Sequence, residues 1–380
     1  MTSEERREAR YLRRKEYRDL KRRSSTKGHD SIERVADINA LIAACKKAKS
    51  GVSWKSSVQR YLMNRVKNAV KTSESILSGK DVRKGFINFD IVERGKLRHI
   101  SSVHFSERVV QRSLCANALI PVLTRGLIYD NGASVKGKGI SFAVNRLKTH
   151  LHRHYRKHGN EGYVLMIDFS NYFGSMRHEP IRELLDKSFE DKRLADFTML
   201  FVDAFGDVGM GLGSEASQIF AIAYPNRVDH CIKERLRIKG YGRYMDDMYL
   251  IHESKARLRE CLEVIRAECA RLGIRLNAKK THIAKLSRGF TFLKTQFFLT
   301  ETGRVILKAG RASIVRQRRK LKKFRKFMDK GLMTYGHIYN SYMSWRGYIG
   351  HKNAYRTIQN MDSLFSTLFL RRSCNGQRTD

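Results

Sequence analysis

The chain of 380 residues has little proline, no closely paired cysteines and no long apolar run. Only three prolines occur, which favours long helices, because proline interrupts them. The six cysteines are scattered without a Cys-x-x-Cys pair, which argues against a zinc site or a disulfide framework and fits a reducing cytoplasm. No stretch approaches the roughly 18–20 apolar residues of a transmembrane helix, and residues 1–23 lack the apolar core of a secretory signal, so we expect no membrane partner.

Acidic residues are scarce relative to basic ones. Aspartate and glutamate number 37 against 76 lysines and arginines, which gives a formal net charge of +39. Ordinary soluble metabolic enzymes do not need such an excess. A charge of this size implies a polyanionic partner, whose binding would weaken with salt because counterions are released.

The spacing of apolar residues predicts an α+β fold. Residues 4–23 are typical of an exposed basic helix. This helix either binds RNA or only keeps the N-terminal segment in contact with water. Helical spacing predicts helices over 32–77, 106–123, 140–158, 179–205, 216–236 and 254–272, and a basic helical region over 310–370. Alternation predicts a β-hairpin over 86–103 and strands at 162–167, 274–276, 290–299 and 304–307.

The most informative stretch is residues 244–247, Tyr-Met-Asp-Asp, which lies between two apolar-aromatic segments. Both flanks are typical of buried strands, so a tight hairpin would hold Asp246 and Asp247 at its tip. Burying uncompensated anions costs several kcal/mol, and the pair therefore needs cations or protons. Two Mg²⁺ ions roughly 3.5–4 Å apart require carboxylates in this arrangement. The alternative for the dipeptide alone is an acidic turn on a solvated hairpin.

Asp168 is a third candidate carboxylate, at the end of the apolar strand 163–167. A single aspartate at a strand end is ordinarily a turn residue. The residues that follow, 169–173 (Phe-Ser-Asn-Tyr-Phe), match the Asp-x-x-x-(Phe/Tyr)-Phe pattern of the first polymerase box. The three aspartates are therefore interpreted together as one metal site.

With these motifs the chain resembles prokaryotic retroelement-type reverse transcriptases, the relatives of group II intron, retron and diversity-generating retroelement enzymes. The resemblance covers about residues 33–355 and is carried, in order, by residues 93–100, 107–111, 136–139, 167–173, 212–218, 244–247, 277–281 and 290–293. It implies a right-hand polymerase with fingers, a ferredoxin-like palm and a short helical thumb. The expected segments are a basic extension (1–30), fingers (31–163), palm with part of the fingers inserted (164–298), thumb (299–372) and tail (373–380).

The resemblance also implies roles for single residues. Asp168, Asp246 and Asp247 would be catalytic and would bind two Mg²⁺ ions. The triphosphate would contact Arg98 and, as a second candidate, Lys96. Lys280 is a candidate general acid or, alternatively, a contact to the template backbone. The remaining expected nucleotide-site residues are Phe169, Phe173, Leu212 and Gly213, with the ring of Phe173 excluding a 2′-hydroxyl. Nucleic acid would bind an amphipathic helix through Arg316, Arg318, Arg319, Lys322, Lys323 and Lys326.

Two positions depart from the commonest family pattern. Many relatives carry glutamine where Leu212 stands, and the form here resembles the aliphatic-Gly-x-x-x-Ser-Gln signature of diversity-generating enzymes. An aliphatic side chain donates no hydrogen bond to the incoming nucleotide, so we hypothesise reduced fidelity; drift at a tolerant position is the alternative. A glycine is usual where Lys294 stands, which leaves the detail of primer contact open.

The function that the resemblance implies is RNA-directed DNA synthesis by an enzyme of a bacterial or phage retroelement. Expected partners are an RNA template, the RNA/DNA duplex, an associated non-coding RNA and, as a further candidate, an accessory protein. A diversity-generating enzyme is the first choice, and a phage-defence reverse transcriptase is the alternative. An RNA-binding scaffold with a vestigial site and an RNA-templated RNA polymerase are the alternatives from other classes. No RNase H, endonuclease or maturase-like extension is expected.

Overall fold

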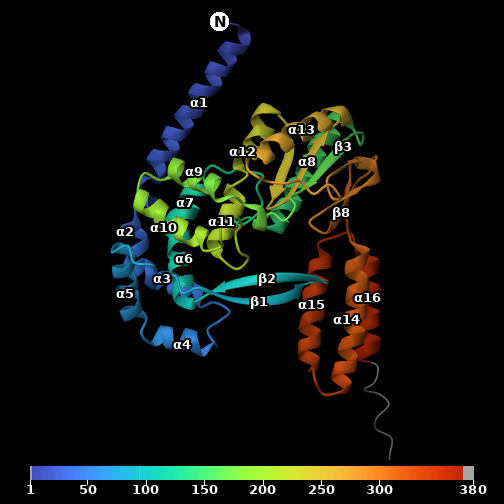
Figure 1. Cartoon of the computed structure of the whole chain (residues 1–380). Coiled ribbons are helices and arrows are strands. Elements are labelled where there is room, and N and C mark those ends of the chain that lie inside the picture. Colours follow the sequence, from blue (N-terminus) through green and yellow to red (C-terminus); the bar gives the residue numbers. More distant parts are fainter. Residues whose placement is uncertain (1, 94, 371–380) are drawn as a thin grey trace, which may run out of the picture. The chain divides into compact units, whose positions relative to one another are not determined.

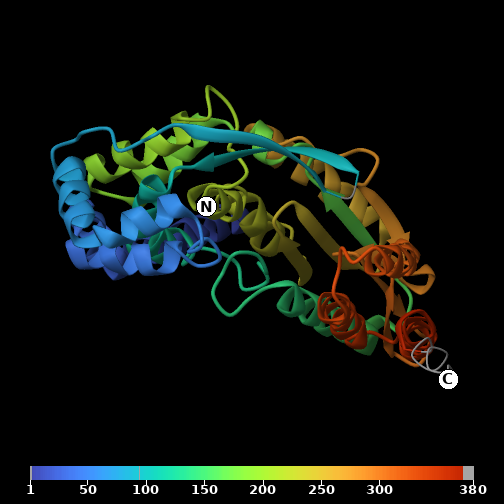
Figure 2. The ribbon, with the colours of Figure 1, turned by 90° about the horizontal axis from the view of Figure 1, so that it is seen from below.

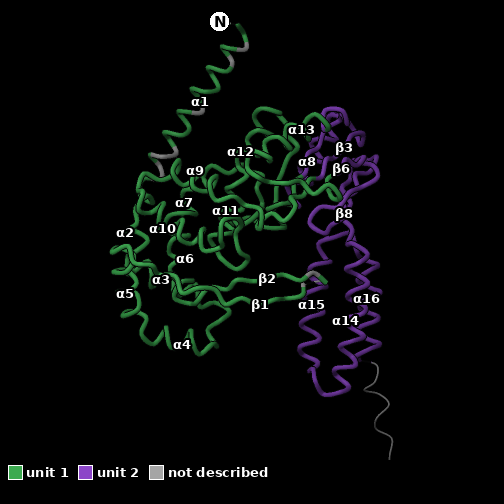
Figure 3. Tube along the Cα trace, viewed as in Figure 1, with its two compact units in different colours: residues 1–143, 167–248, 259–281 green, residues 144–166, 249–258, 282–380 purple. Residues whose placement is uncertain are grey.

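The computed structural model describes residues 2–93 and 95–370 (Figure 1). It separates into two compact units, each made of three stretches of the chain (Figure 3). Unit 1 comprises residues 1–143, 167–248 and 259–281, and unit 2 comprises residues 144–166, 249–258 and 282–380. The predicted tail, residues 373–380, lies outside the described residues. The division into fingers, palm and thumb stays a prediction, because the two units cut the chain at different places.

Helices make up most of unit 1, and α3 (Ile38–Ala48) shows why they form. The side chain of Asp37 caps the helix by accepting a hydrogen bond from the Ala40 amide at 2.7 Å. Leu41 and Cys45 lie on its buried face at helical spacing. This face packs against α6 (Phe105–Leu114).

The remaining helices of unit 1 follow the predicted segments with two breaks. They are α1 (Ser3–Thr26), α2 (Ile32–Ala36), α4 (Ser56–Met63), α5 (Arg65–Leu77), α7 (Ile120–Leu123), α9 (His178–Ser188), α10 (Lys192–Asp203), α11 (Glu215–Ala223), α12 (Asn226–His230) and most of α13 (Lys255–Arg271). Short helical turns are η1 (Lys27–His29), η2 (Cys115–Leu119), η3 (Phe173–Ser175) and η4 (Cys231–Arg235).

Two predicted single helices are wrong. Residues 179–205 form α9 and α10, because Asp191 accepts a hydrogen bond from the Arg193 amide and starts a new helix. Residues 216–236 form α11, α12 and η4, because Pro225 has no amide hydrogen and interrupts the helical bonding.

The strands form three sheets. The hairpin of β1 (Phe86–Glu93) and β2 (Lys96–Val103) confirms the predicted hairpin. A four-stranded sheet has the order β4-β5-β3-β6, and a three-stranded sheet has the order β7-β8-β9. Their bounds are β3 (Tyr163–Asp168), β4 (Gly240–Tyr244), β5 (Asp247–His252), β6 (His282–Lys285), β7 (Phe290–Phe292), β8 (Thr295–Leu299) and β9 (Val305–Ala309). The predicted strand at 274–276 is wrong, since only one isolated bridge, Phe169 to Leu276, forms there.

Unit 2 contains most of α8 (Ile140–His158), the turn η5 (Leu286–Arg288) and three long C-terminal helices. These are α14 (Arg311–Asp329), α15 (Tyr335–Gly350) and α16 (Tyr355–Phe369), seen end-on in Figure 2. Their shared core consists of Leu321, Ile338, Tyr342, Met361, Phe365 and Phe369. No helix in the described part of the chain combines the length and apolar character needed to cross a membrane.

Candidate active site

Asp168 is held at the end of β3, after four buried residues, with only 6% of its surface exposed. Its carbonyl accepts a hydrogen bond from the Asn277 amide at 2.8 Å. Its side-chain Oδ1 accepts from Asn277 Nδ2 at 3.2 Å, and Oδ2 accepts from Lys280 Nζ at 2.6 Å. The carboxylate is therefore fixed in one orientation with an ammonium group beside it.

Asp246 and Asp247 lie at the tip of the β4–β5 hairpin. Met245 and Asp246 form the two-residue connection, and Asp247 begins β5. Met245 has a φ of +54°, the left-handed conformation that short hairpin connections favour. The carbonyl of Asp246 accepts the amide of Phe169 at 3.3 Å, so the hairpin tip contacts the residue after Asp168. The predicted tight hairpin is confirmed.

The carboxylates of this cluster are short of positive charge. Burial, followed by the charges of Asp246 and Asp168, raises the pKa of Asp247 to about 7. Burial and the charge of Asp168 also raise the pKa of Asp246 above the ordinary carboxyl value. Lys280 opposes both shifts. Raised carboxyl pKa values with these causes mean that an added cation would be bound favourably.

The donor set fits a divalent metal ion by its chemistry. Asp168, Asp246 and Asp247 offer oxygen ligands, which hard cations prefer. As the side chains stand, no group of three His, Cys, Asp or Glu residues among 2–93 and 95–370 has the arrangement of a metal site. The Lys280 ammonium instead contacts one oxygen of Asp168. The repulsion among the three carboxylates is the feature that a metal ion would relieve.

Arg98 lies within electrostatic range of these carboxylates. It is on β2 opposite Ile91, with an exposed side chain. Its charge lowers the pKa of Asp246, against the larger effect of burial. A guanidinium there can fork onto phosphate oxygens. The side chain of Lys96, at the start of β2, lies outside the described part of the structure.

The loop that contains Leu212 and Gly213 contacts the backbone of β2. The Leu212 carbonyl accepts the Ser101 amide at 3.3 Å. Gly213 has a φ of +118°, and a Cβ atom there would lie 3.1 Å from the Ser101 carbonyl oxygen. Gly213 is an expected nucleotide-site residue, and the close approach that the structure shows for it is to the backbone of β2. The loop therefore supports the strand that carries Arg98.

The aromatic residues after Asp168 divide into core and surface positions. Phe169 is 2% exposed, and its ring centroid lies 5.1 Å from that of Tyr172. Tyr172 is also buried and donates its hydroxyl hydrogen to the Ala221 carbonyl at 2.6 Å. Phe173 begins η3 and is only half-buried, with its carbonyl accepting the Met210 amide at 2.7 Å. Of these three rings, Phe173 is the one that reaches the surface.

The predicted nucleic-acid-binding residues all lie on α14 in unit 2. Leu321 and Gln317 form its buried side. All six predicted cations are exposed: Arg316, Arg318, Arg319, Lys322, Lys323 and Lys326. The helix is therefore amphipathic, with a cationic outer face.

Two residues to which the sequence assigns no individual role contribute to the site. Asn277 contacts Asp168 through both its backbone and its side chain. Arg243, directly before Tyr244, is fully buried and donates to the Met245 carbonyl. The available signal for Arg243 is a charged residue inside an otherwise buried strand.

Comparison with known proteins identifies the class. The family described as reverse transcriptase (RNA-dependent DNA polymerase) matches residues 83–297, more than half of the chain. The chain belongs to this family, which confirms the α+β right-hand polymerase fold and the reverse-transcriptase resemblance. Domains of this family generally use divalent metal ions. The prokaryotic, diversity-generating subtype stays a prediction.

Two solved telomerase structures are similar to the chain. Apo telomerase from Candida tropicalis, truncated from the C-terminal domain, is 16% identical with a TM-score of 0.46, and the match covers 59% of this chain. Telomerase from Candida albicans with a TWJ fragment of telomeric RNA is 12% identical with a TM-score of 0.49, and the match covers 76% of this chain. The chain spans only 55% and 56% of those two chains. No curated protein matches it.

Proposed function

We propose that the protein is an RNA-directed DNA polymerase that adds dNTPs to a primer 3′-hydroxyl with two Mg²⁺ ions. The observation that carries the proposal is the cluster of Asp168, Asp246 and Asp247. Burial and the neighbouring carboxylates raise the pKa values of Asp246 and Asp247, as expected where too little positive charge lies near the carboxylates. When bound, the two ions supply activation of the 3′-hydroxyl and neutralise the charge that develops on the leaving pyrophosphate.

The protein residues around the ions have separate tasks in this proposal. Arg98, together with Lys96, binds and orients the triphosphate. Lys280, whose pKa is raised by its hydrogen bond to Asp168, is protonated at neutral pH and can donate a proton to the leaving group. The exposed edge of Phe173 borders the sugar. Asn277 keeps Asp168 in its orientation.

The segments receive the roles expected of a right-hand polymerase. Residues 31–163 act as fingers, 164–298 as palm and 299–372 as thumb, after a basic extension over 1–30. The exposed side chains of Arg316, Arg318, Arg319, Lys322, Lys323 and Lys326 on α14 contact backbone phosphates of the RNA/DNA duplex without reading its sequence.

Leu212 favours a diversity-generating role within this class, in a bacterial or phage retroelement with an accessory protein and its own template RNA. A phage-defence enzyme that copies an associated non-coding RNA is the alternative. The scattered cysteines, of which Cys45, Cys115, Cys261 and Cys269 are buried thiols, favour a reducing cytoplasm.

Sequencing of nucleic acid that copurifies with the protein from its native locus tests the function. The matched preparation carries Asp246→Asn. A cDNA present only with the parent protein, mapping to a neighbouring non-coding RNA, is expected. Substitutions confined to one template base would select the diversity-generating role, and a faithful or repetitive product would select phage defence. Copurified RNA without any Asp246-dependent DNA would contradict the proposal and favour the scaffold.

Leu212→Gln is expected to lower the misincorporation frequency by about fivefold, because one added hydrogen bond of roughly 1 kcal/mol would hold the incoming nucleotide in register. The measurement is sequencing of cDNA made on a defined RNA template. Leu212→Met, which changes shape without adding a donor, is the matched control and should leave the error spectrum alone. An unchanged spectrum in Leu212→Gln would count against the fidelity hypothesis.

The triple variant Lys322→Gln/Lys323→Gln/Lys326→Gln is expected to weaken duplex binding and to reduce the slope of log K against log salt. The reduction should be about one for each phosphate that the helix no longer neutralises. Fluorescence anisotropy at several salt concentrations measures this slope. The control is Lys46→Gln/Lys47→Gln on α3, which removes exposed charge from unit 1. An equal reduction of slope per removed charge in both variants would show that α14 has no special part in binding.

A further inference from the structure

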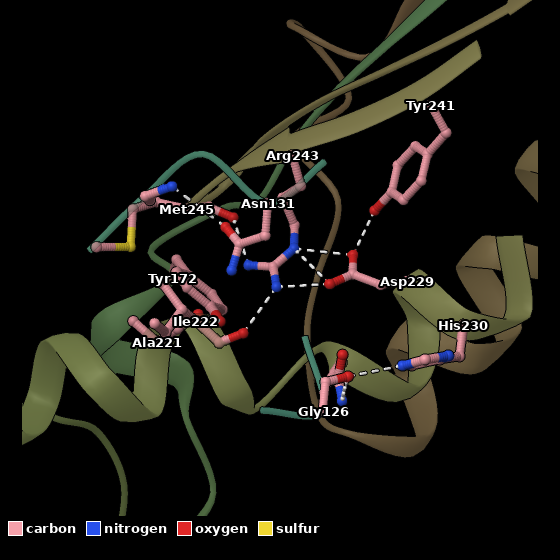
Figure 4. A network of polar contacts seen from close by, with 12 residues as sticks. Gly126, Asn131, Tyr172, Ala221, Ile222, Asp229, His230, Tyr241, Arg243 and Met245 are labelled. Carbon is pink, nitrogen blue, oxygen red and sulfur yellow. Dashed lines mark hydrogen bonds and ion pairs between the residues drawn. The ribbon is translucent and has the colours of Figure 1, made fainter. Parts of the chain in front are cut away.

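A fully buried ion pair lies behind the hairpin that carries Asp246 and Asp247. Arg243 on β4 and Asp229 on α12 both have 0% side-chain exposure. The Arg243 Nε donates to Asp229 Oδ1 at 2.9 Å and to Oδ2 at 3.0 Å, and Nη2 donates to Oδ2 at 2.7 Å. The hydroxyl of Tyr241 also donates to Asp229 (Figure 4). Asp229 thereby holds the guanidinium plane in one orientation.

The remaining contacts of this guanidinium go to backbone carbonyls. Nη2 donates to the Ile222 carbonyl at 2.7 Å, and Nη1 donates to the Met245 carbonyl at 3.2 Å (Figure 4). Met245 is the residue with the left-handed φ of +54°, a conformation that costs energy for any side chain other than glycine. The guanidinium therefore contacts the strained residue of the hairpin directly.

The backbone of Arg243 is fixed from a second direction. Its amide donates to the Asp130 carbonyl at 3.1 Å, and its carbonyl accepts the Gly132 amide at 2.9 Å. A Cβ atom at Gly132 would lie 3.4 Å from Tyr244 Cδ2, so the loop lies close against the hairpin. The strand end before residues 244–247 is thus held on both its backbone and its side-chain side.

Stability alone is a weak explanation for this arrangement. Removing two charges from water costs several kcal/mol per ion, and apolar residues of similar volume often stabilise a fold equally well. An apolar replacement, however, offers no donor to the Met245 carbonyl. The peptide group between Met245 and Asp246 would then be free to rotate, and both carboxylates would move with it.

We propose that Arg243, oriented by Asp229, is a positioning residue that sets the placement of Asp246 and Asp247 through the carbonyl of Met245. The expected effect on kcat rests on the proposed polymerase function. The expected effect on the conformation of the hairpin does not. Lysine at position 243 would keep the positive charge. It lacks the planar guanidinium, whose several N–H groups donate to Asp229 and to the carbonyls of Ile222 and Met245 at the same time.

The first test compares Arg243→Lys with the wild-type protein by single-nucleotide primer extension and by hydrogen exchange without metal. We expect kcat to fall about 10²-fold, because displacement of reacting groups by about 1 Å has effects of that size, with KM for dNTP changing less than about threefold. Amide exchange should accelerate about tenfold in peptides covering 244–247 and should stay unchanged elsewhere in unit 1. Arg182→Lys, which makes the same substitution in an exposed pair on α9, is the control expected to change neither quantity.

A second variant keeps the test decisive if Arg243→Lys unfolds. Asp229→Leu/Tyr241→Phe/Arg243→Met replaces the buried polar groups with apolar ones and should retain the melting temperature within a few degrees. A reduced kcat in this folded variant supports positioning. Wild-type kcat and hairpin exchange in either variant, or faster exchange across the whole of unit 1, would overturn the inference. A wild-type protein without DNA synthesis would overturn the proposed function, while the exchange data would still decide the role of Arg243.

Discussion

Asp246→Asn and Asp247→Asn are each expected to lower the rate of DNA synthesis by roughly 10³-fold or more while raising the unfolding temperature in EDTA. The rate falls because a neutral amide removes a charged oxygen ligand at the point where charge develops. The unfolding temperature rises because each substitution removes one of three mutually repelling carboxylates, two of which have raised pKa values. Primer extension and differential scanning calorimetry measure the two effects.

The gain in stability of Asp247→Asn is expected to depend on pH. In EDTA the pKa of Asp247 is about 7 in the folded protein, above the ordinary carboxyl pKa of about 3.9 that applies to the unfolded chain. The folded state therefore binds a proton that the unfolded state has released, and wild-type stability falls as pH rises from about 4 to 7. Asparagine does not titrate, so the difference in melting temperature should grow over this window and level off above it.

Mg²⁺ should reverse the order of stability. Added metal binds the folded wild-type protein and raises its melting temperature by mass action, whereas the asparagine variants gain less. Asp196→Asn, at an aspartate on α10 with 63% side-chain exposure, is the control that should change neither activity nor the response to metal. An asparagine variant that keeps wild-type synthesis, or one that melts earlier in EDTA, would contradict the metal-site assignment.

The parts of this site that could be predicted from the sequence depend on local pattern. Alternating residues before and after 244–247 define two strands, and a two-residue connection follows from their spacing. The apolar run before Asp168 likewise predicts a buried strand with a carboxylate at its end. In both cases the neighbours along the chain determine the conformation, so no knowledge of tertiary contacts is needed.

The Arg243–Asp229 pair could not be predicted in this way. Helical spacing places Asp229 in one long helix over 216–236, in which its neighbours would be other residues of that helix. The break at Pro225 starts α12 and brings Asp229 against β4. A charged residue in a strand is also ordinarily expected to be exposed, whereas Arg243 is 1% exposed because its partner is buried with it.

The contacts of Asn277 and Lys280 with Asp168 depend on tertiary structure as well. They join residues 109 and 112 positions apart in the chain. The predicted strand at 274–276 is replaced by a single bridge to Phe169, and the segment after it turns so that both side chains reach the end of β3. The sequence shows that an asparagine and a lysine follow this segment, but the spacing of its residues does not predict the turn.

Phe173→Ala is expected to lower the preference for dNTPs over rNTPs by roughly 10²-fold, because removing the ring removes the steric conflict with a 2′-hydroxyl. Of the three rings in residues 169–173, Phe173 is half-buried, whereas Phe169 and Tyr172 are buried, so Phe173 is the ring whose removal is tested. The measurement is kcat/KM for addition of dGTP and of GTP to one primer-template. The change should come from better use of GTP, with dGTP addition altered only slightly.

Tyr172→Phe is the matched control for this prediction. It removes the hydroxyl that donates to the Ala221 carbonyl and should cost about 1 kcal/mol of stability without changing nucleotide preference. An unchanged preference in Phe173→Ala would exclude Phe173 as the residue that discriminates the sugar. A wild-type protein that already uses GTP as well as dGTP would favour an RNA-templated RNA polymerase instead, because the ring of Phe173 would then not exclude a 2′-hydroxyl.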